Sequence, residues 1–274
     1  MMDTVAVNGE VRRLEELRLQ DFLQSFFFGA GFFETFLIEE GAPMFLERHL
    51  ARLRSSLAAH ASCVRAPPPE VLTAGAVREA LRRCLEADVH LGPRFTGVGK
   101  WVAGDGRLLL SFRSLAPQHE RTLRDGWVLD EVEDRCYRRG DPSLNHKSLS
   151  YLRQYTHLGR GTVFVNEAGE LCEVPNGNLF FLVGDTVVTP PLEAPCLPGV
   201  IRSVLLEEGR LGGLPVVERV LTRERLGDVR GCVLTNSVSL VLAVPLLLGR
   251  ALPESHEWAG YARTVVREFA RREG

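Results

Sequence analysis

The stretch Asn145-His146-Lys147-Ser148-Leu149-Ser150-Tyr151 contains one of the only two lysines in a chain of 274 residues. Among its 33 lysines and arginines, only Lys100 and Lys147 are lysine. Arginine keeps its proton near neutral pH, whereas a lysine amine can act as a nucleophile or a base when its surroundings favour the neutral form. Lys147 is therefore a candidate for Schiff-base formation and proton transfer.

Lys100 has a simpler interpretation. The segments Gly97-Val98-Gly99-Lys100 and Gly104-Asp105-Gly106 are typical of the ends of an exposed hairpin. We therefore expect Lys100 to be a surface residue with no chemical role.

Length and composition indicate a globular protein. A chain of 30.5 kDa with 45% hydrophobic residues can form one large or two medium domains. A net charge of −2 gives no reason to expect binding to nucleic acid or to a membrane surface. The N-terminus lacks the features of an export signal, and the apolar run 238–248 is too short to span a bilayer. We expect a soluble protein.

The six cysteines are scattered along the chain, at Cys63, Cys84, Cys136, Cys172, Cys196 and Cys232. They form no C-x-x-C pair and have no histidine partners at metal-ligand spacing. We expect reduced thiols in a cytoplasmic protein, with neither a metal site nor disulfides.

Hydrophobic periodicity predicts a mixed α/β fold. In the first half we expect a loop and buried strand from Phe26 to Ile38, helices at about 43–60 and 71–87, and a hairpin with a buried strand at 108–110. In the second half we expect a strand at 127–129, a charged loop at 133–141 and a helix at 148–158. Further strands are expected at 163–166, 171–173, 178–182, 186–188, 216–217 and 232–236. We also expect a helical turn at 221–226 and helices at about 198–209 and 254–272.

A polar segment with a proline, residues 113–120, is typical of a linker between domains. We place the linker at 115–120. This gives a smaller N-terminal α/β domain, residues 1–114, and a larger, strand-rich C-terminal domain, residues 121–274.

Two further features fit a cofactor that forms an imine with lysine and carries a phosphate. Pro198-Gly199 precedes a predicted helix, and the N–H groups at a helix N-terminus bind anions. Glu173 ends a strand ahead of a tight turn at Pro175-Asn176-Gly177, which we expect to direct it toward a site. Each feature alone is equally compatible with a structural role.

Several spaced motifs resemble those of the class IV (fold type IV) pyridoxal-phosphate enzymes. They are Lys147-Ser148-Leu149-Ser150-Tyr151-Leu152, Gly169-Glu170-Leu171-Cys172-Glu173 with Gly177-Asn178-Leu179-Phe180-Phe181, Thr189-Pro190-Pro191-Leu192 and Leu197-Pro198-Gly199-Val200-Ile201-Arg202. Upstream, residues 29–35 and 45–53 are similar to the family's G-D-G-x-F-E-T and H-L-x-R-L elements. The resemblance covers nearly the whole chain. It implies a two-domain α/β (α+β) fold, a homodimer, and pyridoxal 5′-phosphate held between the domains.

The resemblance also implies roles for the matching residues. Lys147 would bind the cofactor as a Schiff base and then move the substrate proton. Glu173 would pair with the ring nitrogen, and Tyr151 would donate to the ring hydroxyl. The phosphate would be held by Arg52, by the backbone N–H groups of Val200 and Ile201, and by the turn Thr235-Asn236. Without the resemblance, Arg52 would be a helix-surface guanidinium and Tyr151 a core aromatic residue. His146 has no assigned role in the family, and we expect it to be structural.

The chain departs from the family pattern at three positions. Ala30 replaces the usual aspartate of G-D-G, and Ile201 replaces a common threonine, so that one hydroxyl near the phosphate is lost. Ser150 stands where an asparagine is frequent. The backbone donors of the phosphate site are unaffected.

The resemblance leaves the reaction open among branched-chain aminotransferases, D-amino acid aminotransferases and 4-amino-4-deoxychorismate lyases. The chain is short for a branched-chain aminotransferase and lacks the extra glycines such enzymes often have before their tyrosine. We therefore favour a lyase that forms 4-aminobenzoate, a folate precursor, and releases pyruvate from its small-molecule substrate. A class IV aminotransferase is the alternative, and a non-catalytic protein that retains the fold is a third.

Overall fold

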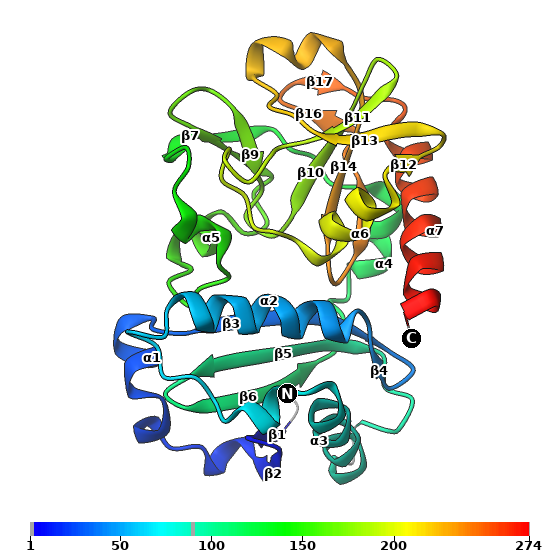
Figure 1. Cartoon of the computed structure of the whole chain (residues 1–274). Helices are drawn as coiled ribbons and strands as arrows, with labels where there is room; N and C mark the ends of the chain where they lie inside the picture. The colour runs from blue at the N-terminus through cyan, green and yellow to red at the C-terminus, as the bar shows by residue number, and fades with distance from the viewer. Residues whose placement is uncertain (1–2, 89–90, 274) are drawn as a thin grey trace. The chain divides into compact units, whose positions relative to one another are not determined.

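The computed structural model describes residues 3–88 and 91–273. Its internal contacts divide the chain into two compact units, Met1–Ala116 with Lys147–Tyr151 and Pro117–His146 with Leu152–Gly274 (Figure 1). The chain thus leaves the first unit after Ala116 and returns to it for the short segment that contains Lys147. The domain boundaries drawn from the sequence stay a prediction.

An antiparallel sheet forms the centre of the first unit, with the strand order β2-β1-β6-β5-β3-β4. Its strands are β1 (Thr4–Val7), β2 (Glu10–Arg13), β3 (Phe32–Glu39), β4 (Ala42–Pro43), β5 (Gly97–Gly104) and β6 (Arg107–Arg113). The short helices η1 (Leu14–Glu16), η2 (Leu19–Phe22) and α1 (Leu23–Phe28) connect β2 to β3. The expected buried strand and hairpin are confirmed.

Two longer helices pack on this sheet, α2 (Leu46–Ala59) on β3 and α3 (Ala74–Ala87) on β1 and β2. They confirm the helices predicted at 43–60 and 71–87, except that η3 (Pro69–Leu72) is separate from α3. Leu50, Leu53 and Leu57 recur at helical spacing and are buried in the core beneath α2. The side chain of Thr73 accepts from the N–H of Ala76 and begins α3.

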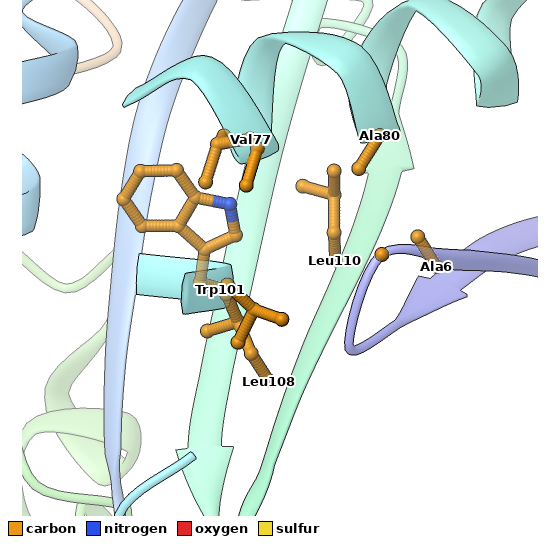
Figure 2. Close-up of a pocket in the computed structure, with 9 residues that line it drawn as sticks. Ala6, Val77, Ala80, Trp101, Leu108 and Leu110 are labelled. Carbon is orange, nitrogen blue, oxygen red and sulfur yellow. The ribbon is translucent and has the colours of Figure 1, made fainter. Parts of the chain in front are cut away.

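The core beneath α3 contains a cavity of about 20 Å³ beside Trp101. Figure 2 shows the indole of Trp101 with Val77 and Ala80 of α3 and with Leu108 and Leu110 of β6. Within the described residues, Trp101 Nε1 is buried without a hydrogen-bond partner. This corner of the core is therefore less tightly packed than its apolar lining alone would predict.

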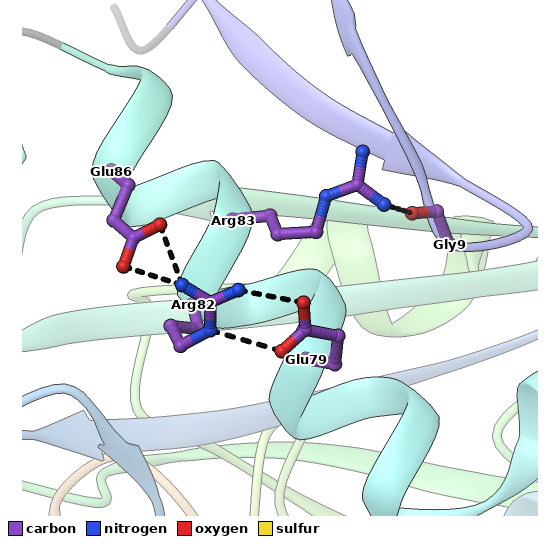
Figure 3. A network of polar contacts seen from close by, with 5 residues as sticks. All are labelled: Gly9, Glu79, Arg82, Arg83 and Glu86. Atoms are coloured by element: carbon purple, nitrogen blue, oxygen red, sulfur yellow. Dashed lines mark hydrogen bonds and ion pairs between the residues drawn. The ribbon is translucent and has the colours of Figure 1, made fainter.

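The outer face of α3 carries a small network of ion pairs. Figure 3 shows Arg82 bonded to Glu79 and Glu86, one turn before and one turn after it, while Arg83 donates to the carbonyl of Gly9. These side chains are solvated, so the network stabilises the helix only weakly.

The second unit has three sheets. The largest has the order β12-β13-β11-β10-β14-β15, the second β7-β8-β9, and the third pairs β16 with β17. The strands are β7 (Glu131–Tyr137), β8 (Thr162–Asn166), β9 (Leu171–Glu173), β10 (Asn178–Val183), β11 (Thr186–Thr189), β12 (Arg210–Leu211), β13 (Leu214–Glu218), β14 (Val229–Asn236), β15 (Leu240–Ala243), β16 (Leu246–Leu247) and β17 (Arg250–Ala251). Those predicted between 163 and 236 are confirmed.

The helices of the second unit are α4 (His119–Asp125), η4 (Pro142–Asn145), α5 (Leu152–His157), α6 (Val200–Glu208), η5 (Arg223–Asp228) and α7 (Ser255–Glu273). Both α6 and α7 pack on β14 and on each other. They confirm the helices predicted at 198–209 and 254–272, and the whole chain has the mixed helices and sheets expected of an α/β (α+β) fold.

Four local predictions were wrong. Residues 26–28, predicted as the start of a loop, form the end of helix α1. The segment predicted as a strand at 127–129 forms only a single bridge, from Leu129 to Leu247. The charged loop predicted at 133–141 is largely strand β7, because its backbone pairs in parallel with β8. The helix predicted at 148–158 begins only at Leu152, because the residues before it pair with β3 of the first unit.

In the residues that the structure describes, no helix is long and apolar enough to cross a membrane. The same residues contain no cluster of three or more acidic, histidine or cysteine side chains arranged to hold a metal ion.

Candidate active site

Lys147 is placed by backbone hydrogen bonds to the start of β3. The N–H of Phe33 donates to the carbonyl of Lys147 (2.9 Å), and the N–H of Leu149 donates to the carbonyl of Gly31 (2.9 Å). An antiparallel bridge joins Phe32 and Ser148 between them. Lys147 therefore lies opposite Phe33, and their side chains share one face of the sheet.

The glycines that precede β3 make room for this pairing. A Cβ atom on Gly31 would lie 2.7 Å from the carbonyl oxygen of Ala103 and 2.8 Å from the Leu149 side chain. Gly29 has a φ of +62°, and a Cβ atom there would lie 2.7 Å from Ser150 Oγ. The glycines of the Gly29-Ala30-Gly31 element thus permit the close approach of the lysine segment.

Two aromatic rings lie beside the amine of Lys147. Its Nζ lies 4.6 Å from the ring centroid of Phe33 and 5.4 Å from that of Tyr151. The two rings pack edge to face, with centroids 5.1 Å apart. The structure therefore brings two predicted residues, Lys147 and Tyr151, together. Phe33 was missed as a site residue, although it lies within the F-E-T element.

Lys100 is exposed in the β5–β6 hairpin, as the sequence predicted, but it is not at the end of that hairpin. It lies within β5, whereas the hairpin turn comes later, at Asp105-Gly106. Gly99 is a glycine because a Cβ atom there would lie 2.3 Å from the Phe36 ring, and not because the chain turns. Lys100 Nζ lies 4.6 Å from the ring centroid of Phe33, the ring that Lys147 also contacts.

Arg52 is held in a buried ion pair. Its Nε donates to Glu34 Oε1 (2.8 Å) and its Nη2 to Glu34 Oε2 (2.5 Å). The side chains are 10% and 1% exposed respectively, so Arg52 is not a helix-surface guanidinium. The fork of two parallel bonds fixes the plane of the guanidinium. Its predicted contact with a phosphate stays a prediction.

His49 completes this group. Its Nδ1 lies 2.7 Å from Glu34 Oε2, and its Nε2 is buried without a hydrogen-bond partner in the described part of the chain. Burial raises the pKa of Glu34, but the charge of Arg52 and the bonds from Arg52 and His49 outweigh this and lower it to about 2.

Burial also lowers the pKa of His49, and the charges of Arg52 and Lys147 act in the same direction, against the effect of Glu34. We therefore assign a neutral His49 that donates from Nδ1 to a Glu34 carboxylate. Sequence reasoning missed Glu34 and His49, although a glutamate within a buried strand signals a buried charge that needs a partner.

In the second unit, both carboxylate oxygens of Glu173 accept hydrogen bonds. Tyr137 Oη donates to Oε1 (2.9 Å), and the backbone N–H of Leu197 donates to Oε2 (2.8 Å). Glu173 is 6% exposed. Burial and the neighbouring Glu173 raise the pKa of Tyr137, so its hydroxyl remains a donor. Tyr137 was missed because its segment was interpreted as a loop.

The bond from Leu197 connects Glu173 to the start of α6. The Leu197 carbonyl accepts from Asn178 Nδ2 (2.8 Å), and a Cβ atom on Gly199 would lie 2.0 Å from Asn178 Oδ1. Val200 and Ile201, the first residues of α6, are buried, and no side-chain cap bond closes this turn in the described residues. The first N–H groups of a helix have no partner within it, so this buried N-terminus suits an anion.

Thr235 and Asn236 end strand β14. Thr235 pairs with Asn178 in the sheet, which places it near the residues that lead into α6. Its Oγ1 is buried and, within 3–88 and 91–273, has no hydrogen-bond partner. Asn236 Oδ1 accepts from the N–H groups of Val238 (3.0 Å) and Ser239 (2.8 Å) and so fixes the predicted turn. An unpaired buried hydroxyl beside a buried helix N-terminus fits a phosphate.

The predicted residues therefore form two groups, each within one compact unit. Lys147, Tyr151 and Arg52 belong to the first unit. Glu173, Val200, Ile201, Thr235 and Asn236 belong to the second. The first group supplies an amine among aromatic rings, and the second supplies a buried carboxylate and donors for an anion.

Comparison with known proteins gives consistent matches. The family model described as amino-transferase class IV matches residues 31–247. An aminodeoxychorismate lyase of Bacillus subtilis is 26% identical over 85% of this chain and 83% of its own. A bifunctional aminodeoxychorismate lyase / D-amino acid transaminase of Mycobacterium tuberculosis is 28% identical over 83% of this chain and 85% of its own.

Solved structures share the fold. A hypothetical aminotransferase from Mycobacterium tuberculosis, in its PLP-bound form, superimposes with a TM-score of 0.80 over 97% of this chain and 99% of its own, at 23% identity. A branched-chain aminotransferase from Escherichia coli superimposes with a TM-score of 0.77 over 98% of this chain and 93% of its own, at 17% identity. The chain thus shares the fold of these solved structures.

Proposed function

Because the chain belongs to the amino-transferase class IV family, and is thus an enzyme that uses pyridoxal 5′-phosphate, we propose that it is a 4-amino-4-deoxychorismate lyase. The family, the enzyme class and the cofactor inferred from the motifs are confirmed by this match. In the proposed reaction the substrate loses a carbon-bound ring proton, and the bond from the ring to its enolpyruvyl oxygen breaks, so that the ring becomes 4-aminobenzoate. The released enol takes up a proton and becomes pyruvate.

The observation that carries the proposal is the placement of Lys147. Backbone bonds to β3 fix its position, and its amine lies over the rings of Phe33 and Tyr151. We assign Lys147 Nζ as the amine that would hold the cofactor through its aldehyde and would then remove the carbon-bound proton of the substrate. Bound pyridoxal 5′-phosphate supplies an electron sink for the charge left on the substrate carbon.

The other predicted residues hold the cofactor in this proposal. Glu173 would accept from the ring nitrogen and keep a proton on it, and Tyr151 would donate to the ring hydroxyl. The donors to the phosphate are Arg52, the N–H groups of Val200 and Ile201, Thr235 Oγ1 and the turn at Asn236. Support comes from the buried Thr235 hydroxyl and the uncapped start of α6. Glu34 and Tyr137 orient Arg52 and Glu173 respectively.

Two arguments favour the lyase over an aminotransferase. The chain is short for a branched-chain aminotransferase, and two relatives with similar coverage have the lyase in their names. The second candidate is a class IV aminotransferase for branched-chain or D-amino acids. The Mycobacterium tuberculosis relative is named as both a lyase and a D-amino acid transaminase, and a third relative is named a putative branched-chain-amino-acid aminotransferase. A non-catalytic protein would not need a lysine at position 147, where backbone hydrogen bonds to β3 fix the residue.

The free cysteines support a cytoplasmic location. All six are unpaired, and five of them are buried or half-buried. Burial raises the pKa of Cys84 to about 12 and that of Cys136 to about 11, so these thiols stay protonated. Thiols of this kind are usual in a reducing compartment.

The cofactor assignment predicts that the purified protein carries a lysine-bound pyridoxal chromophore, which borohydride reduces onto Lys147. Lys147→Arg abolishes the chromophore, because a guanidinium does not form the imine. Mass spectrometry of peptides from the reduced protein locates the label. Recovery of the label on Lys100 would overturn the assignment.

The role of Glu173 predicts that Glu173→Gln retains the cofactor but slows turnover by on the order of 10²-fold, because the ring loses the partner that keeps it protonated. Absorbance measures the bound cofactor and a steady-state assay measures kcat. Glu170→Gln, a change of a nearby buried glutamate, is the matched control. Wild-type turnover in Glu173→Gln would exclude Glu173 as the ring partner.

The reaction itself is tested with aminodeoxychorismate in the absence of any 2-oxo acid. A lyase releases pyruvate and 4-aminobenzoate without an acceptor, whereas a transaminase needs one to regenerate its cofactor. We expect equal amounts of the two products and no dependence on added 2-oxoglutarate. Transamination of leucine or D-alanine with no pyruvate from aminodeoxychorismate would establish the aminotransferase instead.

We also propose that the protein is a homodimer. The three phenylalanines of α1, Phe26, Phe27 and Phe28, are 65%, 63% and 71% exposed. Such a cluster is unusual on a monomer surface. The carboxylate of Asp105 accepts from the N–H groups of Gln24 and Ser25 (both 3.0 Å) and so holds α1 in place. The three phenylalanine side chains are therefore exposed on a fixed helix.

Sedimentation equilibrium tests the dimer. We expect twice the chain mass for the wild type and a shift toward monomer for Phe27→Asp, because a charge in an apolar interface is costly. Tyr261→Asp, at a side chain on α7 that is 50% exposed, is the control and stays dimeric. A monomeric wild type would refute the proposal.

A further inference from the structure

Lys100 and Lys147 contact one phenylalanine ring, although nothing in their sequence positions relates them. Each Nζ lies 4.6 Å from the centroid of the Phe33 ring. The two nitrogens can therefore be separated by no more than twice that distance. All three residues belong to the first compact unit, so the arrangement is internal to it.

The sheet explains why these side chains meet. Lys147 lies opposite Phe33 at one edge of β3, and on the other side of β3 Thr35 pairs with Lys100 of β5. Residues two apart on a strand share a face, so Phe33 and Thr35 face the same way as both lysines. Glu34, between them, points to the opposite face and bonds to α2. Both lysines thus lie on the face away from α2.

The ammonium group of Lys100 is less solvated than that of an ordinary surface lysine. The residue is exposed as a whole, yet its ammonium lies against the Phe33 ring, and burial lowers its pKa, with the charge of Arg113 acting in the same direction. Neighbouring positive charges and partial desolvation both favour binding of an anion. In a chain that otherwise uses arginine, a compact lysine at this place calls for a specific partner.

We propose that Lys100 is a substrate-binding residue that pairs with a carboxylate of the substrate while the substrate amine lies at the cofactor that Lys147 would hold, with Phe33 as the surface on which the substrate ring packs. This inference rests on the proposed function and specifies its substrate class: an amine that carries a carboxylate on the far side of a ring. In 4-aminobenzoate the amine and the carboxylate lie at opposite ends of the ring. The limited separation of the two lysine nitrogens suits such a molecule, whereas a branched-chain amino acid has no second carboxylate for Lys100.

The test compares the binding of 4-aminobenzoate and aniline to the holoenzyme by titration calorimetry. The two probes differ only in the carboxylate. We expect the wild type to prefer 4-aminobenzoate on the order of tenfold, a size typical of one charge-assisted contact. Lys100→Met removes the preference, and Lys100→Arg retains part of it because the charge remains. Arg113→Met, which removes the neighbouring cation but keeps Lys100, leaves most of the preference in place.

A structural role for Lys100 predicts a different pattern. Lys100→Met would then weaken the binding of both probes equally, or it would lower the melting temperature and the cofactor absorbance. Under our proposal the melting temperature and the cofactor absorbance of Lys100→Met are unchanged. Retention of the preference in Lys100→Met, or its absence in the wild type, overturns the proposal. The pyruvate assay on the wild type tests the proposed function separately from the role of Lys100. If the wild type releases pyruvate and Lys100→Met keeps the preference, the protein is a lyase but Lys100 does not bind the carboxylate. If Lys100→Met loses the preference but the wild type releases no pyruvate, Lys100 binds the carboxylate but the protein is not a lyase.

Discussion

The backbone pairing between Lys147 and the start of β3 is the constraint on which the first group of site residues depends. Hydrogen bonds from Phe33 and Leu149 hold this segment at a strand edge, so the position of residue 147 does not rely on packing of its own side chain. What lysine adds at this place is an amine. The same pairing imposes Gly31 and Gly29, because a Cβ atom at either would collide with the incoming segment or its neighbours.

The period of two along β3 separates two electrostatic tasks. Glu34 faces α2, where it compensates the charge of Arg52 and sets the tautomer of His49. Burying such a pair is costly unless its bonds are satisfied, and removing one partner leaves an uncompensated charge. Phe33, one residue earlier, faces the other way and contacts the two lysines. One strand thus orients a guanidinium on one face and supports amines on the other.

The helices and most strands of the second unit were predictable because their periodicity is local. The motif around Lys147 was equally informative, since its chemistry requires a particular residue type. What the sequence did not reveal comes from pairing between distant segments. Strand β7 contains Tyr137 but reads as a charged loop, because it becomes a strand only beside β8. The contact between Lys100 and the Phe33 ring was missed for the same reason, since it depends on the pairing of β5 with β3.

The two lysines also present an electrostatic problem that the fold alone does not solve. At a separation of less than 10 Å and an effective dielectric constant of about 20, two like charges repel by on the order of 2 kcal/mol. The Phe33 ring attracts both ammonium groups, but a cation–π contact at a partly solvated site contributes only about 0.5–1 kcal/mol. An anion that pairs with Lys100 offsets this repulsion, and so does attachment of Lys147 to its cofactor. A substrate that brings a carboxylate and an amine to this face does both, which is why we connect the second lysine with the same reaction as the first.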